Sequence, residues 1–282
     1  MRACARCRLS ESTLSLAIGV NVMLLPAVHE LFAVAGMTSP SGRCHTFDRG
    51  ADGYARAEGI TAAKLAVALA TAAIERSSDD ELAWAGCAVR QDGARASLTA
   101  PNGLAQASLL RASLEDAALS ASGLSAHEAH GTGTTLGDPI EANSLASAVV
   151  TMRLADVPPL AIGTSKANAG HGEPVAGLLG ALALSLTIAL GQATPNAQLR
   201  VLNRLVCDAL PASACTLPTA LCDLPPAAAC AVGGGVSSFG YSGTIAHATL
   251  QLKSGRTVAG GLASRLQLTY RRRRCIGLGA DE

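Results

Sequence analysis

Hydrophobic runs alternate with polar, glycine-rich loops along most of this 282-residue chain. Residues 13–26 (TLSLAIGVNVMLLP) are rich in leucine and β-branched residues and end at a proline, which predicts a buried strand. Residues 27–36 predict a short helix that ends at Gly36. The alanine-rich residues 62–76 predict a second helix, inside an atypical helical segment at 61–82.

The rest of the chain continues this alternation. Strands are predicted within residues 81–90, 158–170 and, around a glycine-rich turn, 230–252. Helices are predicted for residues 102–120, 138–153 and 173–191. Asp138 is the predicted N-cap of the second of these helices, with Pro139 at its first position. Strands that alternate with helices predict an α/β layered fold.

Composition excludes two classes of partner. The net charge is +1 and aromatic residues make up 2% of the chain, so neither a basic surface nor stacking platforms for nucleic acid are expected. The apolar run at residues 177–191 is shorter than the ~20 residues that a membrane helix needs, which predicts a buried helix and no membrane partner. The run of arginines from Arg271 to Arg274 is interpreted as part of a solvated tail.

Nine cysteines, an odd number in a chain of this length, indicate a reduced protein of the cytoplasm. Cys4 and Cys7 form a CxxC with no second pair at zinc-finger distance. The loose cluster from Cys207 to Cys230 also lacks ligand spacing, so scattered small hydrophobic residues are the favoured interpretation and no metal is predicted.

Three polar loops combine glycine with histidine. They are EAHGTGT around His130, TSKANAGH with Lys166 and His171, and SSFGYSGTIAH around Gly240. The first two each follow a predicted strand and precede a helix that begins near a proline, which is where an α/β sheet presents functional groups. None of the loops matches a dinucleotide, phosphate-loop or nucleophile-elbow motif. We therefore place the candidate site at these loops.

Two interpretations of the histidine pair stay open at this point. His130 and His171, with Asp138 and Glu141, are residue types that hold a metal, although their spacing is not that of a ligand set. Alternatively, two neutral imidazoles donate hydrogen bonds to one carbonyl oxygen and stabilise the negative charge that develops there. A nearby lysine such as Lys166 would then orient one histidine or pair with a carboxylate.

Five segments, in order, resemble the β-ketoacyl synthases, most closely the ketosynthase domain of type I polyketide synthases. They are FAVAGMTSPSGRCHTFDRGADGYARAEG, AVRQDGARASLTAPNGLAQASLLRASLEDA, EAHGTGTTLGDPIEA, IGTSKANAGHGEPVAGLLG and GVSSFGYSGTIAHATL. The resemblance implies a thiolase-like fold of α-β-α-β-α layers. It also implies decarboxylative Claisen condensation of acyl and malonyl-type thioesters, with no bound cofactor and substrates carried on the phosphopantetheine of acyl carrier protein.

The resemblance also assigns roles to residues. It implies that His130 and His171 hold the malonyl thioester oxygen, and that Lys166 supports His171 and the polar network around Glu141. It places Phe239 and Gly240 beside the nucleophile. Supporting roles in holding the loops fall to the remaining polar residues of the two histidine motifs, which are Thr132, Thr134, Asp138 and Asn168.

The nucleophilic cysteine of the family has no counterpart, because its segment aligns before Met1 and Cys4 aligns with a later helix position. The expected organisation is a remnant of the N-terminal synthase region at 1–60, the helical segment at 61–82, a C-terminal synthase domain at 83–255 and a disordered tail at 256–282. Such a C-terminal half of the layered fold, with its N-terminal half truncated, should expose apolar surface.

We therefore expect a β-ketoacyl synthase, an acyltransferase, that does not condense alone. The expected partners are acyl carrier protein and a second copy or another synthase chain. A decarboxylase only, a non-catalytic scaffold that docks carrier protein, and an unrelated metal hydrolase built on His130 and His171 are the alternatives.

Overall fold

A six-stranded mixed sheet forms the centre of the computed structural model, which describes residues 12–66, 82–93, 100–224 and 232–252. The strand order is β3 (Leu82–Gln91), β10 (Thr244–Leu252), β9 (Gly233–Phe239), β4 (Leu124–Glu128), β5 (Leu160–Gly163) and β7 (Cys215–Thr216). Strand β10 is antiparallel to β3 and β9, whereas β4 is parallel to β9 and β5, and β5 is parallel to β7. The carboxyl ends of β4, β5 and β9 therefore meet at one edge of the sheet.

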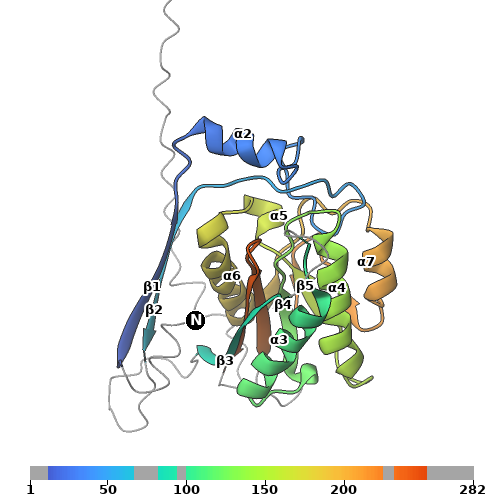
Figure 1. Cartoon of the computed structure of the whole chain (residues 1–282). Coiled ribbons are helices and arrows are strands. Elements are labelled where there is room, and N and C mark those ends of the chain that lie inside the picture. Colours follow the sequence, from blue (N-terminus) through green and yellow to red (C-terminus); the bar gives the residue numbers. More distant parts are fainter. Residues whose placement is uncertain (1–11, 67–81, 94–99, 225–231, 253–282) are drawn as a thin grey trace, which may run out of the picture.

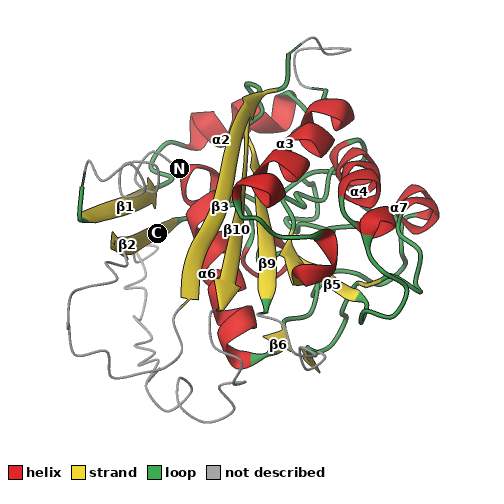
Figure 2. Cartoon of the chain, turned by 90° about the horizontal axis from the view of Figure 1, so that it is seen from below, coloured by secondary structure: helices red, strands yellow, loops and turns green. Residues whose placement is uncertain are grey.

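Helices cover both faces of this sheet (Figure 2). On one side pack α3 (Gly103–Asp116), α4 (Gly137–Ala148) and α7 (Arg204–Ala209), and on the other side packs α6 (Ala176–Leu190). Leu110, Leu145 and Ile162 belong to the apolar core on the first side, and Leu184 of α6 belongs to the second core with Val236. The predicted α/β layered fold is confirmed.

Smaller elements connect these layers. They are α2 (Pro26–Val34), η1 (Ala121–Gly123), η2 (Val150–Met152), α5 (Lys166–Ala169), η3 (Glu173–Val175), and a two-stranded sheet of β6 (Gln192–Ala193) and β8 (Cys222–Asp223). The predicted helix at 27–36 is confirmed as α2, and Gly36 follows it with a φ of +67°. The predicted helices at 102–120 and 173–191 correspond to α3 and to η3 with α6.

An antiparallel ribbon of β1 (Leu14–Asn21) and β2 (Gly59–Ala66) stands apart from the large sheet, beside α6 (Figure 1). A cavity of about 260 Å³ lies between Ala17 of β1 and Val236 of β9. One face of the ribbon carries aliphatic side chains that are 49–75% exposed, namely Leu14, Leu16, Ile18, Val20 and Ile60. The strand predicted at 13–26 is confirmed over β1, but the prediction that it is buried is wrong, because no described element covers this face. The predicted exposed apolar surface is therefore present on the ribbon.

The helix predicted at 62–76, within the segment 61–82, is wrong where the chain is described. Residues 59–66 form β2, paired with β1 from Gly59↔Asn21 to Ala66↔Leu14. Alanine favours a helix, but the ladder of backbone hydrogen bonds to β1 overrides that preference. Residues 67–81, like Cys4, Cys7, Cys230 and the arginine run, lie outside the described residues.

The predicted start of the helix at 138–153 is also wrong. Helix α4 begins at Gly137, with Leu136 as its N-cap, and Asp138 lies inside the first turn, where it is 1% exposed.

Among the described helices, the stretch Glu173–Leu190 is long and apolar enough to cross a membrane by length and composition. Here its helix α6 packs between the sheet and the ribbon, and Ala181, Leu184 and Ile188 are buried, as predicted for a core helix.

Candidate active site

Two histidine rings meet at the edge where the parallel strands end. His130 lies two residues after β4, and His171 follows β5 and the short helix α5. The ring centroids are 5.7 Å apart and the ring planes are at 86°. Phe239, the last residue of β9, lies against His130 with a centroid distance of 5.4 Å. Segments far apart in the sequence are therefore brought together, and the two histidine loops lie at the strand ends as predicted.

The hydrogen bonds to the two rings define which nitrogen carries the proton. The backbone N–H of Phe239 donates to Nδ1 of His130 at 3.2 Å, and the backbone N–H of Glu173 donates to Nδ1 of His171 at 2.9 Å. A ring nitrogen that accepts a hydrogen bond has no proton of its own, so in each neutral ring the proton is on Nε2. Neither Nε2 has a hydrogen-bond partner among the described residues.

Both rings are held in the neutral form. Burial, with a smaller contribution from the positive charge of Lys166, lowers the pKa of His171 to about 3. Burial, Lys166 and His171 together hold the pKa of His130 well below its usual range. Two neutral Nε2–H donors at neutral pH are the form that can stabilise a developing oxyanion.

Two buried carboxylates accept hydrogen bonds from the backbone of the His130 loop. Glu141 of α4 accepts the backbone N–H groups of His130 and Gly131 at 2.7 and 2.8 Å. Asp138 accepts from the backbone of Gly133 at 3.1 Å and of Phe47 at 2.8 Å. Burial raises the pKa of Asp138 to about 7, against the effect of these donors. Asp138 in the first turn of α4 and Glu141 in the next turn therefore both accept hydrogen bonds from loop amides, and Asp138 does not act as the cap.

Threonines complete the packing of this loop. Thr132 is 8% exposed, and its Oγ1 lies 3.4 Å from Oγ1 of Thr134, which accepts the backbone N–H of Gly137 at 3.2 Å. Thr46, from the loop before β2, donates to the carbonyl of Gly131 at 2.8 Å. The predicted supporting residues Thr132 and Thr134 thus lie in the wall of the loop.

Lys166 lies at the centre of the buried charges, with 3% of its surface exposed. Burial lowers its pKa, and the carboxylates of Glu128, then Glu141, raise it. Burial raises the pKa of Glu128, which accepts from the backbone N–H and the hydroxyl of Ser165, each at 2.7 Å, while Lys166 lowers it. The positive charge of Lys166 therefore offsets the negative charges of Glu128 and Glu141 next to the two histidines.

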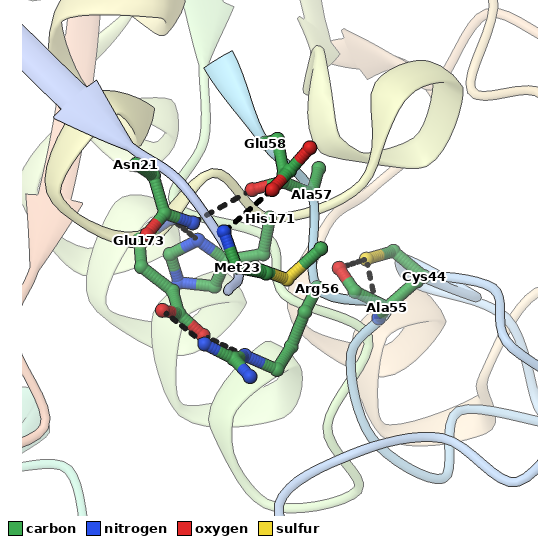
Figure 3. A network of polar contacts seen from close by, with 9 residues as sticks. All are labelled: Asn21, Met23, Cys44, Ala55, Arg56, Ala57, Glu58, His171 and Glu173. Atoms are coloured by element: carbon green, nitrogen blue, oxygen red, sulfur yellow. Dashed lines mark hydrogen bonds and ion pairs between the residues drawn. The ribbon is translucent and has the colours of Figure 1, made fainter. Parts of the chain in front are cut away.

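The His171 loop is bound to the segment before β2 (Figure 3). The backbone N–H of His171 donates to the carbonyl of Ala55 at 2.7 Å, and the N–H of Ala57 donates to the carbonyl of His171 at 2.9 Å. The ring of Tyr54 lies 4.9 Å from the ring of His171. Cys44 is buried beside this segment, where its Sγ accepts the N–H of Ala55 at 3.2 Å, and burial raises the pKa of its thiol.

Two predicted supporting residues do not join the cluster. Asn168 is exposed, and its amide donates to the carbonyl of Pro195 at 2.9 Å. Gly240 is exposed in the turn after Phe239, where its N–H donates to the carbonyl of Thr244. Within the described ranges, no group of three or more His, Cys, Asp or Glu side chains is placed to hold a metal ion.

Sequence reasoning missed several contributors. Glu128 could have been recognised as a lone carboxylate inside a strand pattern, which requires a buried counter-charge. The pair of Arg56 and Glu173 had no such signal, because 117 positions separate the two residues. Thr46 was likewise missed, since only the fold brings it to Gly131.

The chain combines a layered α/β fold with two neutral imidazoles at its strand ends. The family model of the β-ketoacyl synthase N-terminal domain matches residues 1–68, and that of the C-terminal domain matches residues 83–200. Together they cover more than half of the chain. The chain therefore belongs to the β-ketoacyl synthase family, as a ketosynthase domain of the type I polyketide synthase kind.

Curated relatives agree with this assignment. The chain is 39% identical over 251 residues to a phenolphthiocerol/phthiocerol polyketide synthase of Mycobacterium tuberculosis, covering 88% of this chain and 13% of the relative. It is 36% identical over 262 residues to 6-methylsalicylic acid synthase of Aspergillus niger, covering 89% of this chain and 14% of the relative. The chain thus spans about a seventh of these relatives.

Solved structures show the same fold. The ketosynthase from module 6 of the bacillaene synthase of Bacillus subtilis 168 matches with a TM-score of 0.80 and 30% identity over 89% of this chain. An oxazolomycin ketosynthase domain of Streptomyces albus JA3453 matches with a TM-score of 0.81 and 31% identity over 91%. In both cases the chain spans 44% of the solved chain, and the fold is thiolase-like.

Proposed function

We propose that His130 and His171 activate a malonyl-type thioester for decarboxylative condensation. The bond between the malonyl carboxylate and the α-carbon breaks, CO₂ leaves, and the electron pair forms an enolate on the thioester. The Nε2–H groups of both rings donate to the enolate oxygen. The α-carbon then attacks an acyl thioester held on a cysteine, forming a carbon–carbon bond and releasing the thiolate.

One observation carries the proposal. Each ring accepts a backbone N–H at Nδ1, so both Nε2 atoms are donors, and neither is used by the described residues. A general base would need the opposite arrangement, with a free acceptor nitrogen facing the substrate. A pair of donors and no free base is suited to receiving negative charge.

The surrounding charges favour the same step. Negative charge develops at the enolate oxygen, and the ammonium of Lys166 lies close enough to lower the pKa of both histidines. Lys166 thereby stabilises an anion at the rings while Glu128 and Glu141 balance its charge when no substrate is bound. The rings remain neutral donors throughout, which avoids a proton transfer that the step does not require.

The acyl-bearing cysteine of the condensation step has no candidate among the described residues. Cys44 is the cysteine beside the site, but its thiol is buried and its pKa is raised, which opposes thiolate formation. We infer that the described residues supply the malonyl-activating part of the reaction. The substrates are proposed to arrive on the phosphopantetheine of acyl carrier protein in the cytoplasm, with a second copy or another synthase chain as partner.

Release of CO₂ from a malonyl thioester of phosphopantetheine, measured with the purified full chain, tests the proposal. His130→Ala and His171→Ala should each lower the rate about 10²-fold to 10³-fold, the loss expected for one oxyanion donor. His29→Gln, at an exposed histidine of α2, is the matched control and should keep the wild-type rate.

The outcomes separate the alternatives. No release of CO₂ above the uncatalysed rate would refute decarboxylation by this chain. Binding of malonyl-loaded acyl carrier protein without turnover would then identify the scaffold alternative. Activity that disappears on removal of zinc and returns with it would identify the metal hydrolase instead.

A further inference from the structure

An ion pair joins Arg56 to Glu173, which lies two residues after His171. Nε of Arg56 donates to Oε1 of Glu173 at 2.6 Å, and an Nη of Arg56 donates to Oε2 at 3.1 Å (Figure 3). The two side chains are only 6% and 20% exposed. Phe32 of α2 covers the guanidinium, whose carbon lies 5.0 Å from the ring centroid. The pair is thus bidentate and shielded, the geometry in which an arginine fixes a carboxylate most firmly.

The backbone of Glu173 is in an unfavourable conformation. Its φ is +50°, in the left-handed region that residues with a Cβ rarely adopt. Pro174 follows it and restricts it further. In this conformation the N–H of Glu173 points back to Nδ1 of His171 at 2.9 Å. The surrounding structure must therefore hold Glu173 in place, and the ion pair with Arg56 is the strongest contact of its side chain among the described residues.

The two residues beside Arg56 also form backbone hydrogen bonds with His171. Ala55 accepts the N–H of His171, and Ala57 donates to the carbonyl of His171, so residues 55–57 run alongside the histidine. The Arg56 side chain then reaches across to Glu173, two residues further along the same loop. Residues 55–57 thus bind the backbone of His171, and its ring accepts the N–H of Glu173, the ion-pair partner of Arg56.

We propose that Arg56 is a positioning residue that acts through Glu173 to hold His171 in the Nε2–H tautomer. The inference rests on the proposed role of His171 as an oxyanion donor. Without the ion pair, Glu173 relaxes to an ordinary φ, its N–H leaves Nδ1, and the His171 proton distributes between the two ring nitrogens. His130 is unaffected, because its Nδ1 is held by Phe239 of β9.

Nitrogen NMR of the full chain labelled with ¹⁵N-histidine tests this directly. In the wild type at neutral pH, Nδ1 of His171 should resonate as a pyridine-type and Nε2 as a pyrrole-type nitrogen, assigned with His171→Gln. Arg56→Met and Glu173→Ala should move both resonances toward each other. Arg56→Lys, which keeps the charge, should restore most of the wild-type pattern.

Glu173→Gly provides a matched variant. Glycine adopts a positive φ without a Cβ penalty, so it should keep more of the Nε2–H tautomer than Glu173→Ala although neither variant has the ion pair. In the decarboxylation assay, Arg56→Met should lower kcat about fivefold to tenfold, the factor that one hydrogen bond is worth, with KM nearly unchanged. The His130 resonances in the same spectra report that the variant is folded.

Unchanged His171 resonances in Arg56→Met and Glu173→Ala would overturn the proposal. Equal behaviour of Glu173→Ala and Glu173→Gly would also overturn it, because the backbone conformation would then not be the link. A shift of His130 as large as that of His171 would show general loosening and count against it too. A wild type that shows the expected spectra but releases no CO₂ would refute the proposed function alone.

Discussion

Acid should destabilise this protein through His127, a side chain buried in β4. His127 is 2% exposed, and neither of its ring nitrogens has a hydrogen-bond partner among the described residues. Its ring stacks on that of His247 at 5.6 Å and 14°. A Cβ added at Gly235 would lie 3.1 Å from Nδ1 of His127, so the pocket around the ring has no room for a partner there.

The magnitude follows from the pKa. Burial lowers the pKa of His127 from 6.5 to about 4. Between these values the unfolded chain binds a proton that the folded protein does not, so the free energy of unfolding decreases as the pH falls from 6.5 to 4. The full effect is about 3 kcal/mol, and about 2 kcal/mol is lost by pH 5.

His127→Leu isolates this effect. Leucine fills a similar volume without two unsatisfied polar atoms, so the variant should be no less stable than the wild type at pH 7. Urea unfolding at pH 7 and pH 5 measures both proteins, and the variant should lose about 2 kcal/mol less between these values. His29→Gln, which removes an exposed imidazole, should behave like the wild type. An equal acid loss in His127→Leu and the wild type would refute the reasoning.

Three further predictions concern the loops, the ribbon and the buried lysine. Gly133→Ala should lower the free energy of unfolding by more than the about 1 kcal/mol expected for Gly93→Ala. Both glycines have a positive φ, but only at Gly133 would the added Cβ lie 2.7 Å from a backbone nitrogen. Urea unfolding measures both variants, and the reverse order would contradict this prediction. Leu16→Ser should lower the binding of a hydrophobic dye more than Leu104→Ser at an isolated exposed site of α3, and equal effects would argue against a continuous apolar face. Lys166→Met should destabilise the chain by about 3–5 kcal/mol, since it leaves buried acids without their counter-charge; a loss below 1 kcal/mol in thermal unfolding would contradict this.

Much of the fold could be predicted because local pattern and global packing agree. The glycine-rich turn between β9 and β10 and the apolar helix α6 were both predicted from their own residues. Strand β2 was not, because its alanines favour a helix and only pairing with β1 makes it a strand. The apolar pattern of β1 likewise predicted a strand but said nothing of what would cover it.

The candidate site was likewise predictable from the sequence only in part. His130 and His171 could be placed from glycine-rich loops after predicted strands, and the structure brings their rings together. The role of Asp138 could not, because a carboxylate before a proline is also what a helix cap requires. The contact of Arg56 with Glu173 depends on the tertiary fold, and a sequence pattern reports only neighbours along a helix or strand.

The ribbon and the site share one chain of hydrogen bonds. Asn21, at the end of β1, donates to the carbonyl of Ala57 at 2.7 Å, and Ala57 in turn donates to the carbonyl of His171 (Figure 3). A single residue, Ala57, thus connects the end of the exposed apolar strand to the backbone of a proposed oxyanion donor. We therefore expect association of another chain with the ribbon to be linked to the geometry of the His171 loop. Any chain that buries the ribbon more tightly when His171 is ordered will order His171 by the same free energy.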